Sequence, residues 1–244
     1  MSRTSKPAAG EPAAGEPAEG VVQWRRERRR ELIARRQGLS ATERQRCQRR
    51  IEELIGTQFP GLAGVLLGFY WPFRGEIGVH GLVRGLIGQG ARAALPVVIE
   101  KKRPLEFWAW HPGAALARGI WDIPVPAERR LVQPSVLLVP LVGFDARGYR
   151  LGHGGGYYDR TLAAMTPRPF TIGIGHELAR LPTIHPQPHD IPMDAIVTEA
   201  GVTRRPAGPP ADEDEPRGFA SPPCFMHELD PAWLGLGEED EPGP

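Results

Sequence analysis

The densest group of residues that could do chemistry lies in one glycine-rich segment, residues 150–160, with the sequence RLGHGGGYYDR. It holds Gly152 and Gly154–Gly156, followed by a predicted helix that begins with two tyrosines. Glycine leaves backbone N–H groups without Cβ shielding, and a helix N-terminus adds unpaired N–H groups and the positive end of the helix dipole. The segment therefore predicts a seat for phosphate groups.

Charged residues flank these glycines on both sides. Arg150 and Arg160 bracket the loop, and we expect them to supply mobile positive charge. Asp159 lies in the first turn of the predicted helix, where its carboxylate could hold a divalent cation that bridges phosphate oxygens. The alternative is a strand–turn–helix connection in which the glycines permit tight packing and Asp159 is only a cap. Composition leaves both interpretations open.

Standard nucleotide and zinc motifs are excluded by the details of the sequence. A Walker A loop ends in Gly-Lys-Ser/Thr, and no such ending follows Gly156. A dinucleotide fingerprint requires a last glycine where this segment has Tyr157. His153, His185 and His189 lack cysteine partners at the spacing of a zinc site.

Hydrophobic periodicity and turn residues predict the elements that must position this segment. Helices are expected at 22–37, 40–55, 79–87 and 157–165, and strands at 62–71, 91–99, 105–110, 136–142, 170–175 and 194–197. Ser40 and Glu43 have the spacing of a capping box at the start of the second helix. The first two helices should form a basic hairpin, because eleven arginines and three glutamates lie between Trp24 and Arg50.

Strands that alternate with helices predict an α/β fold: a three-layer sandwich with a mainly parallel central sheet and helices on both faces. Such sheets bind ligands beyond the carboxyl ends of their strands. Glu76, Trp121 and residues 150–159 all follow predicted strands. We therefore expect one site where these loops meet, although Glu76 taken alone could be a helix cap and Trp121 a packing residue.

The predicted α/β domain spans residues 22–202. Residues 1–21 lack apolar periodicity, and residues 203–244 combine many prolines and glycines with ten acidic residues and three arginines. Both segments are expected to be disordered. The net charge of +1 gives no general attraction to nucleic acid, so the arginines of the first helices are expected to face solvent rather than RNA.

Cysteine content and hydropathy bear on location. Cys47 and Cys224 lie far apart, which suits free thiols in a reducing cytoplasm rather than a disulfide or a metal site. The apolar runs are only as long as strands, and no basic start precedes an apolar segment, so neither secretion nor a membrane span is expected. We expect a cytoplasmic monomer that acts on small molecules.

The segment from Pro140 to Asp159 follows one long pattern, Pro-x-x-x-Phe-Asp-x-x-Gly-x-Arg-Leu-Gly-x-Gly-x-Gly-Tyr-Tyr-Asp. This pattern resembles the signature of the 5-formyltetrahydrofolate cyclo-ligase family, also called methenyltetrahydrofolate synthetases. Shorter matches follow the same order along the chain: Arg25 with Arg29, Tyr70-x-Pro72 with Glu76, Trp121-x-Ile123-Pro124, and His189-Asp190. The resemblance covers about residues 22–200.

By position, the resemblance implies that ATP is bound by Arg25, Arg29, Arg150, Leu151, Gly152, His153, Gly154, Gly155, Gly156, Tyr157 and Tyr158. Arg150 is the implied catalytic residue. The resemblance further implies folate contacts by Glu76 and Trp121, with Trp71 a weaker candidate, and Mg²⁺ ligation by Asp159 and Asp190. This chain departs from the family pattern at three positions, where it has Arg25 for the usual Lys, His153 for a bulky or cationic residue, and Val125 for an acidic residue.

The implied activity is the ATP-dependent conversion of 5-formyltetrahydrofolate to 5,10-methenyltetrahydrofolate, with release of ADP and phosphate. This is a ligase reaction of one-carbon metabolism, with Mg²⁺ as cofactor and ATP as co-substrate. One alternative is a relative of the same fold that binds folate or nucleotide with little turnover. Another is an RNA-binding role for the arginine-rich helix, which the near-neutral charge and the acidic tail oppose.

Overall fold

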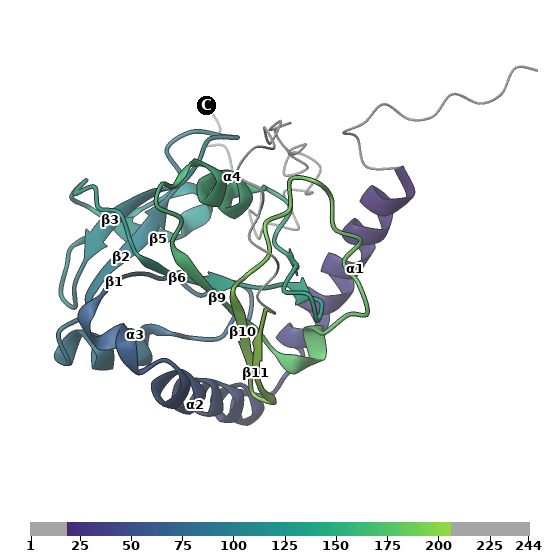
Figure 1. The fold of residues 1–244 in the computed structure, drawn as a ribbon, viewed down its shortest axis with the longest axis horizontal. Helices are drawn as coiled ribbons and strands as arrows, with labels where there is room; N and C mark the ends of the chain where they lie inside the picture. Colours follow the sequence, from purple (N-terminus) through teal and green to yellow (C-terminus); the bar gives the residue numbers. More distant parts are fainter. Residues whose placement is uncertain (1–18, 206–244) are drawn as a thin grey trace, which may run out of the picture.

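A seven-stranded sheet forms the centre of the molecule in the computed structural model, which describes residues 19–205 (Figure 1). In sheet order the strands are β11 (Gly201–Arg204), β10 (Ala195–Thr198), β9 (Phe170–Ile174), β6 (Val136–Pro140), β1 (Leu66–Gly68), β2 (Arg92–Val97) and β3 (Glu106–Trp110). The five inner strands are parallel to one another, and the edge strands β3 and β11 pair antiparallel with their neighbours. The predicted mainly parallel sheet is confirmed.

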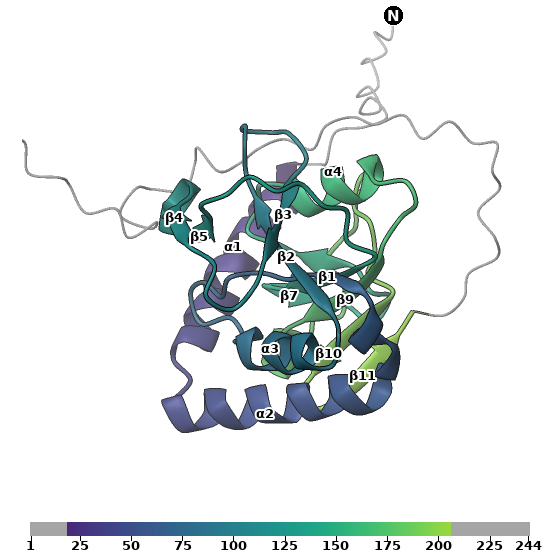
Figure 2. The same cartoon turned by 90° about the vertical axis from the view of Figure 1, so that its left-hand side faces the viewer.

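Helices cover both faces of this sheet, as predicted (Figures 1 and 2). On one face, α1 (Glu19–Gln37) and α4 (Tyr157–Ala164) contribute Leu32, Ile33 and Leu162 to a hydrophobic cluster with Leu137 and Val139 of β6. On the other face, α2 (Ala41–Gln58) and α3 (His80–Gly88) pack on the alternate residues of the same strand. The near-continuous apolar sequence of β6 is what a strand buried on both faces requires.

The two basic N-terminal helices follow one another as predicted, but they do not lie side by side. α1 belongs to one hydrophobic cluster and α2 to the other, so the chain passes from one face of the sheet to the other between Gln37 and Ala41 (Figure 2). The predicted capping box is present: Ser40 accepts from the amide of Glu43, and the Glu43 carboxylate accepts from the amide of Ser40.

Several element boundaries differ from expectation. The strand expected at 62–71 is reduced to β1, because a 3₁₀ turn occupies Pro60–Gly64. Two short antiparallel ladders were not predicted: β4 (Leu116–Arg118) with β5 (Pro124–Pro126), and β7 (Gly143–Phe144) with β8 (Arg150–Leu151).

The described helices and strands extend slightly beyond the predicted bounds of 22–202. Helix α1 begins at Glu19, and β11 continues to Arg204. The remainder of the two expected extensions lies outside the described residues. Within residues 19–205, no helix is long and apolar enough to cross a membrane.

Candidate functional site

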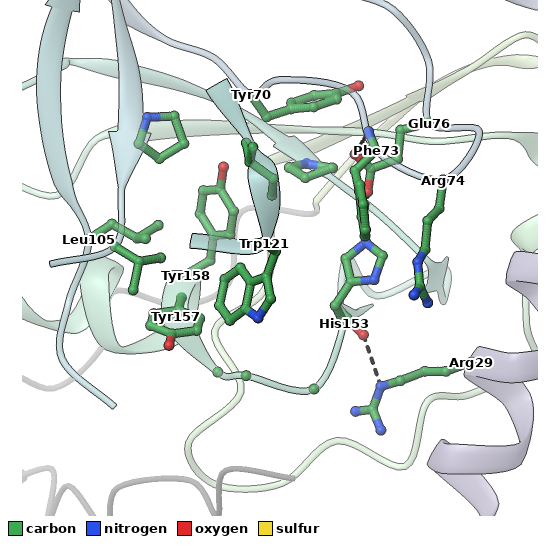
Figure 3. A pocket seen from close by; sticks show the side chains of 18 of the residues that line it. Arg29, Tyr70, Phe73, Arg74, Glu76, Leu105, Trp121, His153, Tyr157 and Tyr158 are labelled. Carbon is green, nitrogen blue, oxygen red and sulfur yellow. Dashed lines mark hydrogen bonds and ion pairs between the residues drawn. The ribbon is translucent and has the colours of Figure 1, made fainter. Parts of the chain in front are cut away.

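The three predicted loops meet at one cavity of ≈ 230 Å³ beyond the carboxyl ends of the central strands (Figure 3). Its lining includes Glu76, Trp121 and the glycine-rich loop, together with residues from α1 and from the strand ends. A cavity of this size is near the lower limit, roughly 300 Å³, of small-molecule sites. The expectation that these loops converge is therefore confirmed.

Glu76 lies at the wall of this cavity, where three donors from separate segments meet. Its carboxylate accepts from the Phe73 amide at 3.0 Å, from His153 Nε2 at 2.9 Å and from the Arg36 guanidinium at 3.5 Å. The side chains of Arg36 and Glu76 are only 3% and 5% exposed. Burial lowers the pKa of Arg36, and the charge of Glu76 opposes that shift. Glu76 is thus a fixed negative group in the site.

Aromatic side chains form the opposite wall. Trp121 has left-handed backbone angles, φ 59° and ψ 30°, and its ring lies 5.9 Å from that of Tyr157 (Figure 3). Such angles are strained for a bulky residue and are enriched at functional sites. Trp71 also lines the cavity and packs edge-on against His80 at 4.3 Å. Burial raises the pKa of the Tyr158 hydroxyl, and the charge of Glu76 adds to that shift.

The glycine-rich loop presents its backbone toward the cavity. Gly154 has φ 98°, and Gly156 has φ 63° as the N-cap of α4, so both adopt the left-handed conformation that glycine favours. Among residues 19–205, none of the amides of residues 152–156 donates to a protein acceptor. The loop therefore offers a row of available N–H donors next to the N-terminus of α4, which is the geometry of a phosphate seat.

Arg29 of α1 lies beside the glycine-rich loop. Its guanidinium donates to the carbonyl of Gly152 at 2.9 Å (Figure 3). Burial, together with the nearby charge of Arg25, lowers the pKa of Arg29 to about 10, so the side chain remains positive at neutral pH. Arg29 therefore places a charge beside the loop that was predicted to bind ATP.

The two arginines that bracket the loop are held in place, so the expectation of mobile charge was wrong. Arg150 is buried, donates to the carbonyl of Ile191 at 3.0 Å and pairs with Asp159 at 3.1 Å. Arg160 is also buried and donates to the carbonyl of Gly155 at 2.6 Å. Of these two arginines, only Arg150 lines the cavity, where it places a positive charge that is held in position before any ligand binds.

Arg25 and Asp190 form a buried ion pair with each other. Arg25 also donates to the carbonyls of Ile184 and His185, so it attaches α1 to the proline-rich loop 182–190. Neither partner is among the described residues that line the cavity, and the predictions that Arg25 binds ATP and Asp190 binds a metal stay predictions.

Asp159 faces the cavity, unlike Asp190. Its carboxylate accepts from the Ile191 amide at 3.1 Å while it pairs with Arg150. Oxygen ligands of this kind suit Mg²⁺, which is commonly held by one or two carboxylates and by substrate phosphates. The donor set at Asp159 therefore fits a magnesium ion that arrives with a nucleotide.

Sequence reasoning missed part of the cavity lining and placed one residue differently. Arg26, Arg30, Phe73, Arg74 and Leu105 line the cavity but were not predicted, whereas Tyr70, which also lines it, belongs to the matched Tyr70-x-Pro72 segment. For Arg26 and Arg30, the one available signal was their helical spacing relative to Arg29. Leu151 is fully buried in β8 and packs inside the domain instead of lining the cavity. The side chain of His153 points toward Glu76 and Phe73 (Figure 3).

Comparisons with known proteins agree with this fold and site. The family model for the 5-formyltetrahydrofolate cyclo-ligase family matches residues 21–199. A 5-formyltetrahydrofolate cyclo-ligase from Escherichia coli strain K12 is 31% identical over 175 residues, which cover 69% of this chain and 96% of the relative. One from Mycolicibacterium smegmatis is 36% identical over 140 residues, 53% of this chain and 71% of the relative.

Solved structures show the same similarity. A 5,10-methenyltetrahydrofolate synthetase from Aquifex aeolicus superposes with a TM-score of 0.67 at 27% identity, covering 78% of this chain and 97% of the other. One from Mycoplasma pneumoniae superposes with a TM-score of 0.60 at 25% identity, covering 72% and 98%. The family match spans nearly all of the described α/β domain, and this chain therefore belongs to the 5-formyltetrahydrofolate cyclo-ligase family.

Proposed function

We propose that this protein converts 5-formyltetrahydrofolate and ATP into 5,10-methenyltetrahydrofolate, ADP and phosphate. The observation that carries this proposal is the arrangement of the cavity. A buried carboxylate at Glu76 and a row of available amides at residues 152–156 face the same space, and His153 connects the two. The Glu76 carboxylate suits the N–H groups of a reduced pterin, and the amides of residues 152–156 suit phosphate.

The proposed reaction overcomes the poor reactivity of an amide-like formyl group. The formyl oxygen attacks the terminal phosphorus of ATP, the bond from that phosphorus to the ADP oxygen breaks, and the formyl carbon becomes strongly electrophilic. N10 of the same folate then attacks that carbon and loses its proton. The carbon–oxygen bond breaks, phosphate leaves, and the five-membered ring is closed. No covalent bond to the protein is required.

The protein's part in this reaction is positioning and charge stabilisation. The amides of residues 152–156 and the N-terminus of α4 would hold the phosphate chain. Arg150 and Arg29 would neutralise the charge that develops on the transferred phosphoryl group. Arg150 is already fixed by Asp159 and by the Ile191 carbonyl, so it needs little rearrangement on binding.

The folate would bind between Glu76 and the aromatic wall. The carboxylate of Glu76 would accept hydrogen bonds from the pterin N–H groups, and Trp121 with Tyr157 would cover a face of the ring. Mg²⁺, held by Asp159 and the ATP phosphates, would supply further neutralisation of phosphate charge when bound. Asp190 would join it only if the ion pair with Arg25 opens.

One incubation tests the proposal. The purified full-length protein is mixed with 5-formyltetrahydrofolate, ATP and Mg²⁺, and the absorbance of the methenyl product and the release of ADP are followed together. We expect both products in equal amounts, and neither product without ATP. Folate binding without ADP release would instead identify a relative that binds without turnover, and the proposed activity would be wrong.

A further inference from the structure

Three metal-ligating side chains lie together on the side of the sheet that α2 covers. Cys47 belongs to α2, His176 follows β9 and Glu199 follows β10. Their ligand atoms all lie within 4.8 Å of one another. Cys47 and His176 are buried, and none of the three belongs to the described lining of the substrate cavity. The cluster is thus separate from the proposed phosphate and folate sites.

His176, one of the three clustered residues, has a ring nitrogen that is not engaged in a hydrogen bond within residues 19–205. Its Nε2 lies 3.3 Å from the carbonyl of Gly75, which can only accept, so Nε2 carries the proton. Nδ1 is then a bare lone pair, and among the described residues this buried atom has no hydrogen-bond partner. An imidazole that donates one N–H to a backbone carbonyl and offers the other nitrogen is the arrangement found in metal-binding histidines. Burial also lowers the pKa of His176, which keeps the ring in its neutral, ligating form.

Cys47 and Glu199 complete a set of sulfur, nitrogen and oxygen donors. Burial, and then the negative charge of Glu199, raises the pKa of the Cys47 thiol. Without a cation, the thiol proton therefore remains in place beside the carboxylate. A divalent cation would displace that proton, and the two resulting negative charges would balance its own. The Oε2 atom of Glu199 accepts from the Glu177 amide at 3.1 Å, which orients the carboxylate.

Positive charges near the cluster are already engaged elsewhere. Arg36 and Arg44 both act to lower the pKa of His176. Arg36 donates to the carbonyls of Arg74 and Leu141 and pairs with Glu76. The guanidinium of Arg44 donates to the carbonyl of Gln37 at the end of α1 and to the carbonyl of Leu39. Arg46 and Glu43 lie on α2 near Cys47 with opposite charges, so their effects on the thiol oppose each other.

We propose that Cys47, His176 and Glu199 bind one Zn²⁺ ion. Zinc favours thiolate, imidazole and carboxylate ligands at bond lengths of about 2.0–2.3 Å, which place tetrahedral ligands less than about 4 Å apart. The ligand atoms lie within 4.8 Å of one another, so binding needs a contraction of at most about 1 Å between any two of them. Water would take the fourth position. Spacing in the sequence could not indicate this site, because the three ligands come from separate elements.

The position of this site gives it a structural role. It joins α2 to the ends of β9 and β10, and His176 contacts the carbonyl of Gly75, the residue before Glu76. A bound ion would therefore hold His176 against the loop that carries the proposed folate-binding carboxylate. We expect metal binding to raise the thermal stability of the domain, whether or not the protein has the proposed activity.

The test uses the full-length protein after removal of metal by a chelator. Zn²⁺ alone is added, and its stoichiometry, its affinity and the change in Tm are measured. Co²⁺ is then substituted for Zn²⁺ to detect sulfur-to-metal charge transfer. We expect one ion per chain, a thiolate band and a raised Tm. Because loss of an outer-shell partner alone costs 10–100-fold in affinity, Cys47→Ser and Glu199→Gln should bind at least about 100-fold more weakly.

Cys224→Ser is the matched control, since it removes the other thiol of the chain and should leave binding unchanged. Wild-type protein that takes up no Zn²⁺ would overturn the proposal. Binding that survives Cys47→Ser but is lost in Cys224→Ser would also overturn it, because the ion would then be bound by the C-terminal segment. The unperturbed Tm of each metal-free variant establishes that it is folded, and His176→Gln provides a third ligand variant if one of the others is not.

Discussion

Glu76 differs from an ordinary carboxylate near a helix start in what it contacts. Helix α3 begins only at His80, with Val79 as its N-cap, so Glu76 does not cap it. Its carboxylate instead joins α1, through Arg36, to the glycine-rich loop, through His153. Ordinary capping was the simpler interpretation of the sequence, and the structure removes it. Glu76 also lines the cavity, and its proposed folate contact there is the role to be tested.

Replacing Glu76 by Gln tests that role with little change of shape. A hydrogen bond to a charged group contributes roughly 1.5–3 kcal/mol, so the KM for folate should rise by about 10- to 150-fold while the KM for ATP changes little. Steady-state kinetics with each substrate varied in turn measures this. Glu100→Gln, an exposed carboxylate outside the cavity lining, is the control. An unchanged folate KM in Glu76→Gln would contradict the assignment.

Asp159 is expected to affect turnover and not folate binding. Its carboxylate lines the cavity beside Arg150, where the proposed mechanism has it hold Mg²⁺ with the ATP phosphates. Asp159→Asn should therefore lower kcat by at least about 100-fold, as loss of one charge-stabilising group typically does. Folate binding, measured by fluorescence titration without ATP, should stay the same. Equal losses of turnover and folate affinity would mean that Asp159 only supports the fold.

His80 makes the stability of the domain depend on pH. Its ring contacts Phe69, Trp71 and Trp110, and burial, aided by the charge of Arg84, lowers its pKa. The unfolded chain binds a proton at His80 near pH 6.5, whereas the folded state binds it only at lower pH. Stability should therefore fall as the pH drops below about 6.5.

Phe fits among the same aromatic rings without titrating. His80→Phe should therefore flatten the part of the stability curve below about pH 6.5 relative to wild type. Urea unfolding at several pH values measures this, and the exposed His111→Phe is the control. Parallel curves for wild type and His80→Phe would show that the ring contributes nothing to acid sensitivity.

At the scale of elements, the capping box determines where α2 begins. Ser40 and Glu43 exchange hydrogen bonds in both directions at the turn where the chain crosses from one face of the sheet to the other. Ser40→Ala should cost about 1 kcal/mol of stability, the usual loss for an N-cap. Chemical denaturation measures the loss, and Ser40→Asp should largely restore stability because it can accept the same bond. A stable Ser40→Ala would indicate that packing alone fixes the start of the helix.

The helices and strands that could be predicted have a clear hydrophobic pattern in the sequence, and the elements that were missed have none. The apolar run of β6 and the spacing of Val79 to Ile87 indicate a strand and a helix directly. Ladders β4–β5 and β7–β8 contain only two or three residues per strand, too few for any periodicity to be recognised. Likewise, no propensity predicts left-handed angles at Trp121, which the surrounding chain must impose.

At the scale of the molecule, topology made the main features of the site predictable. Parallel strands deliver their following loops to one edge of the sheet, so Glu76 after β1 and the glycine-rich loop after β6 could be brought together from chain order alone. Trp121 lies between β4 and β5, after the antiparallel strand β3, so this rule does not account for its place in the cavity. Side-chain contacts between different layers of the fold could not be predicted in this way. The pairing of Arg36 with Glu76 and the meeting of Cys47 with His176 depend on how α1 and α2 pack on opposite faces, which no local pattern encodes.

Truncation can test where the stable and active part of the chain ends on its C-terminal side. Strand β11 completes the sheet, Arg204 donates to the carbonyl of Gln58 in α2, and the Arg205 amide donates to the carbonyl of Asp194. The family match ends at residue 199, before this strand. We expect a chain that ends after Arg205 to keep the kcat/KM and Tm of the full protein.

A chain that ends after Ala200 exposes β10 as an unpaired edge, so its Tm should fall and it should aggregate. Equal stability of the two truncated chains would show that β11 is dispensable, and loss of activity in the longer one would assign a role in catalysis to residues 206–244.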